Sequence, residues 1–137
     1  MQKVLFDTNI ILDIALKRVP HFNKALQLFK LIDQKLILGY ITATTITDIY
    51  YIAKNEKGHK SAIEFITNLI EIIEVIGVDK DIIISAINSE MKDFEDAVQA
   101  LAAEFNEIEC LITRNKKDFA KSGQLVYTPE EFLEKQE

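Results

Sequence analysis

The side chains in this chain that could do chemistry are mainly carboxylates. Four aspartates lie after predicted strands or at the start of a predicted helix: Asp7, Asp48, Asp96 and Asp118. Grouped carboxylates without His or Cys favour a hard cation such as Mg²⁺ or Mn²⁺, bound through oxygen atoms and water. Such a cation polarises a phosphate and lowers the pKa of bound water, which is the chemistry that a nuclease needs.

Each of these acids also has a purely structural interpretation. Asp7 directly follows an apolar run, where Asp is a favoured N-cap for the helix that comes next. Taken alone, it is better explained as that cap. Asp48 fits a solvent-facing helix position equally well, and Asp118 fits a short helix inside a polar turn.

The acids at positions 93–96 open a predicted helix and differ in what they imply. Asp93 is the natural N-cap, and Glu95 suits the helix dipole. Asp96 instead heads a row of small residues with Ala100 and Ala103, which permits close approach of another element. A carboxylate there should be partly buried, and it then needs a cation or hydrogen bonds. The predicted core stripe of this helix is Phe94, Ala97, Val98, Leu101, Ala102 and Phe105.

A polar segment follows the fourth predicted strand. It brings Thr113, Asn115 and Asp118 to one edge of the sheet, and it contains two basic residues, Arg114 and Lys116. Because these two lie beside the predicted acidic pocket, we expect them to position a phosphate.

Short apolar runs alternate with longer helical patterns and predict the elements that position these residues. Strands separated by helices indicate crossover connections and a parallel sheet, and nearly all-apolar strands indicate that both faces are covered. The fold class is therefore α/β, a three-layer α/β/α sandwich with a central parallel sheet, whose ligand site lies at the carboxyl ends of the strands. The predicted strands are 3–6, 36–41, 74–78, 109–113 and 125–127, and the helices are 10–16, 21–35, 44–54, 61–73, 79–89, 93–106, 116–120 and 129–135, with a turn at 55–58.

Composition narrows the class of protein. The 137 residues are 48% hydrophobic and 28% charged, which predicts one soluble domain over positions 1–137, with neither a signal peptide nor a membrane span. The single cysteine, Cys110, lies in an apolar run and is expected to be a buried, unreactive thiol. These features fit a reducing cytoplasm.

Charge and motifs narrow the function. The net charge of −6 argues against broad electrostatic binding of nucleic acid, although a carboxylate cluster for cations would itself make the chain acidic. A glycine-rich phosphate loop is absent from the sequence. The only histidines, His21 and His59, lie beside loops and make no plausible Ser-His-Asp set.

Three ordered segments resemble those of PIN domains, and in particular VapC-like toxins of bacterial toxin–antitoxin systems. They are Asp7-Thr8-Asn9, Asp93-Phe94-Glu95-Asp96-Ala97 and Thr113-Arg114-Asn115-Lys116-Lys117-Asp118-Phe119. The resemblance covers essentially the whole chain. It implies an endoribonuclease dependent on Mg²⁺ or Mn²⁺, held inactive by a small antitoxin and present as a homodimer.

The resemblance also implies roles for individual residues. Asp7 and Asp96 match metal-binding acids, while Asp48 stands where the family usually has Glu. The fourth acidic position falls at Asn115, with Asp118 three residues later. These five form the expected catalytic set. Substrate binding is expected from the polar residues that flank them: Thr8, Asn9, Thr113, Arg114 and Lys116.

Two alternatives stay open. Asn115 in place of an acid is consistent with a degenerate PIN-like module that only binds RNA or a partner protein. A phosphoryl-transfer fold of the receiver or phosphatase type also places an aspartate after a strand. The phosphatase signature needs a second aspartate two residues later, however, and Asn9 is there.

Overall fold

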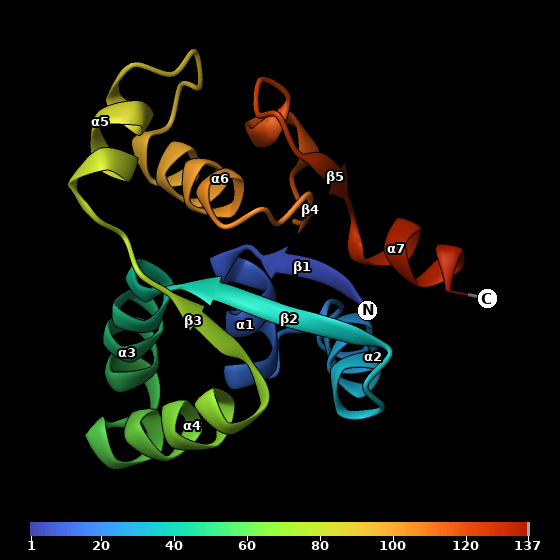
Figure 1. Ribbon diagram of the computed structural model, residues 1–137. Helices are drawn as coiled ribbons and strands as arrows, with labels where there is room; N and C mark the ends of the chain where they lie inside the picture. The colour runs from blue at the N-terminus through green and yellow to red at the C-terminus, as the bar shows by residue number, and fades with distance from the viewer. Residues whose placement is uncertain (137) are drawn as a thin grey trace.

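Five strands form one parallel sheet between layers of helices in the computed structural model, which describes residues 1–136 (Figure 1). The strand order is β3-β2-β1-β4-β5, and every neighbouring pair is parallel. The predicted α/β sandwich is confirmed. The strands are β1 (Gln2–Phe6), β2 (Ile37–Thr42), β3 (Glu74–Ile76), β4 (Cys110–Ile112) and β5 (Leu125–Tyr127).

The chain changes direction across the sheet between β1 and β4. It proceeds from β1 to β2 and β3 on one side, then returns to place β4 and β5 on the other. Phe6 pairs with Ile112 in the register, and the backbone N–H of Asp7 donates to the carbonyl of Ile112 at 3.0 Å. The residues that follow these two strands therefore lie together at the switch point, where open α/β sheets bind ligands.

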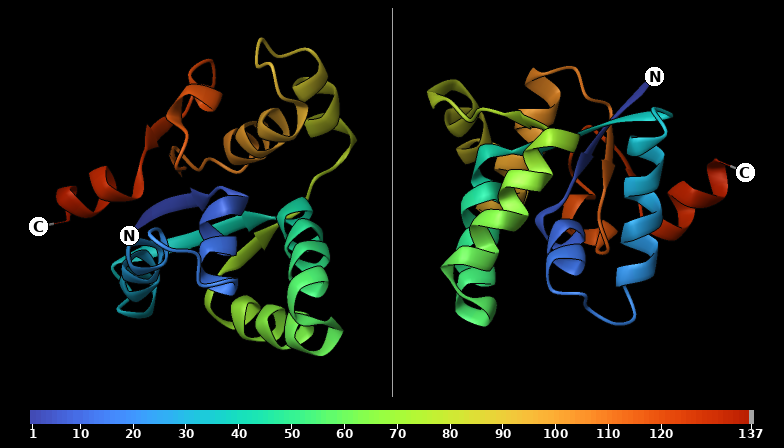
Figure 2. Two further views of the ribbon diagram at one scale, coloured as in Figure 1. Left: turned by 180° about the vertical axis from the view of Figure 1, so that it is seen from behind. Right: turned by 90° about the horizontal axis from the view of Figure 1, so that it is seen from below.

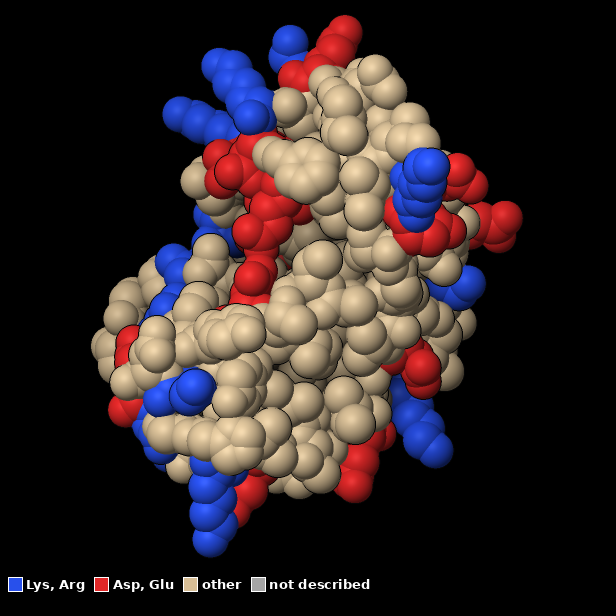
Figure 3. Space-filling view, turned by 90° about the vertical axis from the view of Figure 1, so that its left-hand side faces the viewer, with Lys and Arg blue, Asp and Glu red and all other residues tan. Residues whose placement is uncertain are grey.

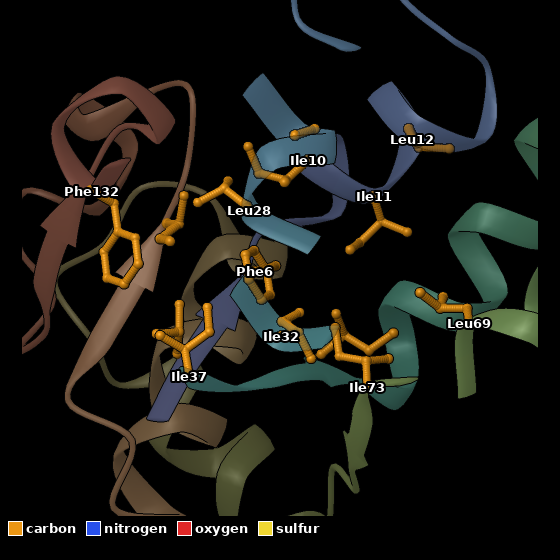
Figure 4. Packing of buried hydrophobic residues seen from close by; sticks show 14 of the residues in the cluster. Phe6, Ile10, Ile11, Leu12, Leu28, Ile32, Ile37, Leu69, Ile73 and Phe132 are labelled. Carbon is orange, nitrogen blue, oxygen red and sulfur yellow. The ribbon is translucent and has the colours of Figure 1, made fainter. Parts of the chain in front are cut away.

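Alternating side chains of the central strands reach the two helical layers. Val4 and Phe6 pack on one face, among helices α1 (Thr8–Ala15), α2 (Phe22–Asp33), α3 (Ala43–Lys57), α4 (His59–Ile72) and α7 (Pro129–Lys135). Leu5 packs on the opposite face, against α5 (Lys80–Ile87), α6 (Phe94–Phe105) and the 3-10 turn η1 (Lys116–Phe119). Figure 2 shows the two layers from behind and below, and Figure 4 shows Phe6 within the first cluster. Both faces are covered, which explains why the strands are apolar throughout.

Side-chain caps define where several helices begin. The Asp93 carboxylate accepts a 2.9 Å hydrogen bond from the N–H of Asp96, so the predicted cap of α6 is confirmed. Thr128 and Glu131 form a capping box at α7, with Pro129 in its first turn.

Two details of the predicted helices are wrong. The turn expected at 55–58 is absent, because α3 continues to Lys57 and only Gly58, with φ of 89°, separates it from α4. Phe94 and Phe105 are not core residues, since they are 53% and 50% exposed. The alanines of α6 contact the sheet closely instead. The large side chains of Phe94 and Phe105, at the two ends of α6, do not fit between this helix and the sheet.

No helix within residues 1–136 has both the length and the apolar character needed to cross a bilayer. Cys110 is fully buried in β4, which confirms the predicted burial, and this burial raises the pKa of its thiol to about 12 and so disfavours the reactive thiolate.

Candidate functional site

The Asp7 carboxylate is held by two side chains from distant parts of the chain. Its Oδ1 accepts a hydrogen bond of 3.0 Å from Gln99 Nε2, and its Oδ2 accepts one of 2.8 Å from Thr113 Oγ1. Asp7 occupies the N-cap position of α1, but its side chain makes no capping hydrogen bond. Asp7 is therefore the N-cap residue by position, as predicted, but its carboxylate does not cap the helix. Both oxygens are oriented by the sheet and by α6 rather than by α1.

A cavity of about 540 Å³ lies at this end of the sheet and is lined by carboxylates from several elements. Figure 3 shows acidic side chains forming a strip across one face of the molecule. The tertiary structure thus brings together all five residues of the expected catalytic set. The acidic and amide residues in its lining are Asp7, Asn9, Asp48, Asp93, Glu95, Asp96, Gln99, Asn115 and Asp118.

Asp96 is the acid most strongly affected by these surroundings. Burial, followed by the charges of Asp93, Asp7 and Asp118, raises the pKa of its carboxyl to about 7. The predicted row of small residues explains the burial, because Ala100 and Ala103 are 3% and 0% exposed and bring α6 close to the sheet. A group with this pKa is half protonated near neutrality unless a cation replaces the proton.

Glu95 faces Asp48 across the cavity. Its hydrogen bond with Asp48, together with burial and the Asp48 charge, raises the pKa of Glu95 to about 7. Two carboxylates can hydrogen bond only by sharing a proton, and a cation between them fulfils the same need. The assignment of Glu95 to the helix dipole alone missed this contact, because helix periodicity does not show which element α6 meets at its first turn.

Gln99 is a site residue that the sequence analysis missed. It is 2% exposed, it lines the cavity, and its Oε1 has no hydrogen-bond partner among the described residues. A buried amide oxygen without a donor is costly, so it indicates room for a water or a cation beside Asp7. The available signal was that Gln99 is the only polar residue in the small apolar stretch 97–103.

Thr8, Thr113 and Asn9 were expected to bind substrate and all make contacts within the protein. Thr8 is buried, and its hydroxyl lies 2.9 Å from Thr45 Oγ1, which joins α1 to α3. Thr113 is fully buried and holds Asp7. Asn9 is exposed at the cavity and accepts a 3.4 Å hydrogen bond from Arg18.

The two basic residues expected to position phosphate are each paired with an acid. Arg114 forms an ion pair with the buried Asp13, with Nε 3.0 Å from Oδ2, and its Nη1 lies 3.1 Å from His21 Nε2. Lys116 is 3.2 Å from Glu131 on α7 and does not line the acidic cavity. Arg114 does line the cavity, but its guanidinium is largely engaged.

The donor atoms fit a hard divalent cation. Within residues 1–136, no three His, Cys, Asp or Glu side chains converge closely enough to hold one ion by themselves. Mg²⁺ does not require such a cage, because it retains several waters and commonly takes one or two carboxylates. Asp7, Asp96 and the unpartnered Gln99 oxygen supply oxygen donors only, which suits Mg²⁺ or Mn²⁺ rather than a thiol-binding metal.

Comparison of this chain with known proteins identifies one matching family and several solved structures with a similar fold. A family model described as PIN domain matches residues 3–117. The toxin-antitoxin complex from Klebsiella pneumoniae has 27% identity and a TM-score of 0.68, covering 92% of this chain and 97% of that one. VapBC2 from Rickettsia felis, solved with a promoter DNA fragment, has 15% identity and a TM-score of 0.72, with coverage of 93% and 98%.

VapC20 from Mycobacterium tuberculosis, described as a toxin that cleaves the sarcin-ricin loop, is a further structural neighbour. It has 14% identity and a TM-score of 0.68, covering 89% of this chain and 96% of that one. A search of curated protein sequences found no significant match.

Proposed function

The chain belongs to the PIN-domain family, and on that premise we propose that it is an endoribonuclease that uses Mg²⁺ or Mn²⁺ to hydrolyse phosphodiester bonds in RNA. One observation carries the proposal. The buried Asp7, oriented by Gln99 and Thr113, lies in one cavity with Asp96, Asp48 and other acids. Such an arrangement of uncompensated carboxylates is stable only with protons or cations bound.

Asp7 and Asp96 are the residues that would hold the ion, with Asp48, Asn115 and Asp118 around it in the same cavity. When bound, a divalent cation polarises the scissile phosphate and provides an activated water. Gln99 and Thr113 keep the Asp7 carboxylate in one orientation, which reduces the reorganisation needed on binding. Glu95, whose pKa is raised to about 7 beside Asp48, gives the cavity a carboxyl group that exchanges protons near neutral pH.

We also propose that this single PIN-like domain, residues 1–137, is the toxin of a cytoplasmic toxin–antitoxin pair. The support is that one similar structure is described as a toxin-antitoxin complex, another as VapBC2 bound to promoter DNA, and a third as a toxin that cleaves the sarcin-ricin loop. The partners are then RNA, a cognate antitoxin protein and a second copy of the chain. A neighbouring gene for a short DNA-binding protein, and copurification of its product with this chain, would test this role.

The proposed activity is tested by replacing the acids that would hold the ion. Asp7→Asn and Asp96→Asn should each abolish Mn²⁺-dependent cleavage of RNA while the circular dichroism spectrum is unchanged. Asp33→Asn, an exposed acid at the end of α2, is the matched control and should cleave normally. Full cleavage by both site variants would contradict the proposal.

The second candidate is a catalytically degenerate module that binds RNA or a partner protein. It is favoured by Asn115, which lines the cavity at the position where the resemblance expects an acid. Calorimetric titration with Mn²⁺ separates the two candidates, because an active nuclease binds the ion at millimolar concentration or below. If only Asn115→Asp binds Mn²⁺ and cleaves RNA, the natural chain is the degenerate module.

A further inference from the structure

A second cavity adjoins the acidic one, on the other side of Asp96 and Asp118. It has a volume of about 360 Å³ and is bounded by the α5–α6 connection and by η1 with the residues that follow it. Three acids, Asp93, Asp96 and Asp118, line both cavities, so the two cavities share a wall of carboxylates. The volume lies within the range of about 300–1,000 Å³ that is usual for small-ligand sites.

Three lysines line this second cavity, which we call the lysine cavity: Lys92, Lys117 and Lys121. A fourth acid, Glu90, lines it as well. All three are exposed. Within residues 1–136, the two ion pairs that form use Arg114 and Lys116, so no acid is paired with any of these three lysines. Their ammonium groups are available to an anion beside the acids that would hold a cation.

The positions of these charges answer a difficulty raised by the acidic composition. A chain with net charge −6 repels a polyanion over most of its surface, so RNA needs a local basic region next to the cleavage site. Figure 3 shows basic side chains gathered at one end of the acidic strip. Arg114 and Lys116 cannot readily fill this role because Asp13 and Glu131 already hold them.

We propose that the lysine cavity binds the backbone phosphate of an RNA nucleotide next to the scissile one, through Lys117 and Lys121, with Lys92 on the opposite wall. This inference rests on the proposed function, because it deepens the substrate site of the same enzyme. Lysine acts as a point charge toward phosphate and reads no base, so these contacts set the register of the strand without sequence preference. The half-buried Met91 supplies an apolar wall for the attached nucleoside.

RNA binding measured without cleavage tests the proposal. The probe is a fluorescein-labelled oligouridylate of about twelve nucleotides, titrated by fluorescence anisotropy in EDTA over a series of salt concentrations. Lys117→Gln/Lys121→Gln should weaken binding and reduce the slope of log affinity against log salt by about 0.7, because the two lysines neutralise one phosphate and each neutralised phosphate on a single strand contributes about that amount. The control Lys24→Gln/Lys60→Gln removes the same charge from exposed positions on α2 and α4 and should keep the wild-type slope.

Each other outcome overturns the proposal. The proposal is overturned if the lysine-cavity variant keeps the wild-type salt slope, or if the control variant loses as much of that slope. It is also overturned if the wild-type protein does not bind the RNA. Normal RNA binding by that variant together with loss of an acidic partner protein would assign the cavity to protein docking. A parallel cleavage assay in Mn²⁺ keeps the two proposals distinct. If RNA binding depends on the two lysines but the wild-type protein does not cleave RNA, only the proposed nuclease activity is contradicted. If the wild-type protein cleaves RNA but its RNA binding does not depend on the lysines, only the proposed phosphate site is contradicted.

Discussion

Thr113 and Asp7, which are 106 positions apart in the sequence, are joined by a hydrogen bond of 2.8 Å from the threonine hydroxyl to Oδ2 of the aspartate. Each residue follows a strand, and β1 and β4 are neighbours at the point where the strand order reverses. Thr113 is fully buried, and its Oγ1 also accepts from the N–H of Asn115. One hydroxyl thus links an acid that would hold the ion to the loop that carries Asn115 and Asp118.

Thr113→Val tests whether this hydroxyl orients the metal site. Valine keeps nearly the same shape but removes the donor, so Asp7 Oδ2 loses its partner. Because supporting hydrogen bonds typically change metal affinity or activity by about 10–100-fold, we expect Mn²⁺ affinity to fall by about that factor. Calorimetry measures the affinity, and Thr113→Ser, which restores the hydroxyl, should recover most of it. A valine variant with wild-type affinity would show that the hydrogen bond is only structural.

Metal affinity should depend on pH through Asp96. The pKa of its carboxyl is about 7 without a cation, and a metal ligand must be ionised. Mn²⁺ affinity should therefore rise as pH increases from about 5.5 to 7.5, with release of protons on binding. Calorimetric titrations in two buffers with different ionisation enthalpies measure the number of protons released. A flat pH profile in this range would mean that Asp96 is not a ligand.

Stability of the metal-free protein should change with pH in the opposite sense. The folded-state pKa of Asp96, about 7, exceeds its ordinary value of 3.8, so between these values the folded state binds more protons than the unfolded state. The free energy of unfolding therefore falls as pH rises through this window. Asp96→Asn removes the repulsion and, after allowance for partial exposure, should raise the thermal midpoint at pH 7.5 by roughly 3 °C. Scanning calorimetry in EDTA at pH 5 and 7.5 makes the comparison, and a difference that is larger at pH 5 would contradict it.

Arg114 should prove to be a stabilising residue rather than a phosphate ligand. Burial raises the pKa of Asp13, and Arg114 is the main group that opposes this shift. Arg114→Ala leaves the Asp13 carboxyl, only 1% exposed, without its ion-pair partner, which should cost about 2–4 kcal/mol of unfolding free energy. Urea denaturation measures the loss.

The salt dependence of RNA binding separates the two roles of Arg114. We expect Arg114→Ala to keep the wild-type slope of RNA affinity against salt, unlike the lysine-cavity variant. Asp13→Asn/Arg114→Ala should be more stable than Arg114→Ala alone, because the double variant no longer buries an unpaired acid. A reduced salt slope with normal stability would restore Arg114 to a phosphate-binding role.

A larger side chain at Gly39 should destabilise the fold, because β2 passes closely under α2. A Cβ at this position would lie 2.6 Å from Ile32 Cδ1 and 3.0 Å from Phe6 Cε2. Ile32 must shift within a packed core, so Gly39→Ala should lower the unfolding free energy by about 1–3 kcal/mol. Gly77→Ala is the control, since its Cβ would meet nothing within 4 Å, and it should change stability by less than about 0.5 kcal/mol. Equal urea midpoints for the two variants would show that the core accommodates the methyl group.

Local sequence was sufficient to predict the order of strands and helices and the edge of the sheet where the site lies. Apolar runs separated by helical patterns indicate parallel crossovers, and the acids follow from their positions at strand ends. It was also sufficient to separate Asp96 from Asp93, because Asp96 heads a row of small residues with Ala100 and Ala103 within the helix, whereas Asp93 stands before it as the N-cap. These predictions depend on the spacing of apolar residues, which repeats every two residues in a strand and every 3.6 residues in a helix. A single segment of sequence displays that spacing by itself.

The tertiary structure decided which side chains meet. The roles of Gln99 and Glu95 depend on what α6 contacts, and no pattern within α6 carries that information. The tertiary structure also decided which basic residues form ion pairs. Arg114 pairs with Asp13, and Lys116 pairs with Glu131. Lys117 is identical in type to Lys116 but lines a cavity. Contacts between segments distant in the chain form only when the sheet brings those segments together, so their energies appear in the packed molecule and not in any local stretch of sequence.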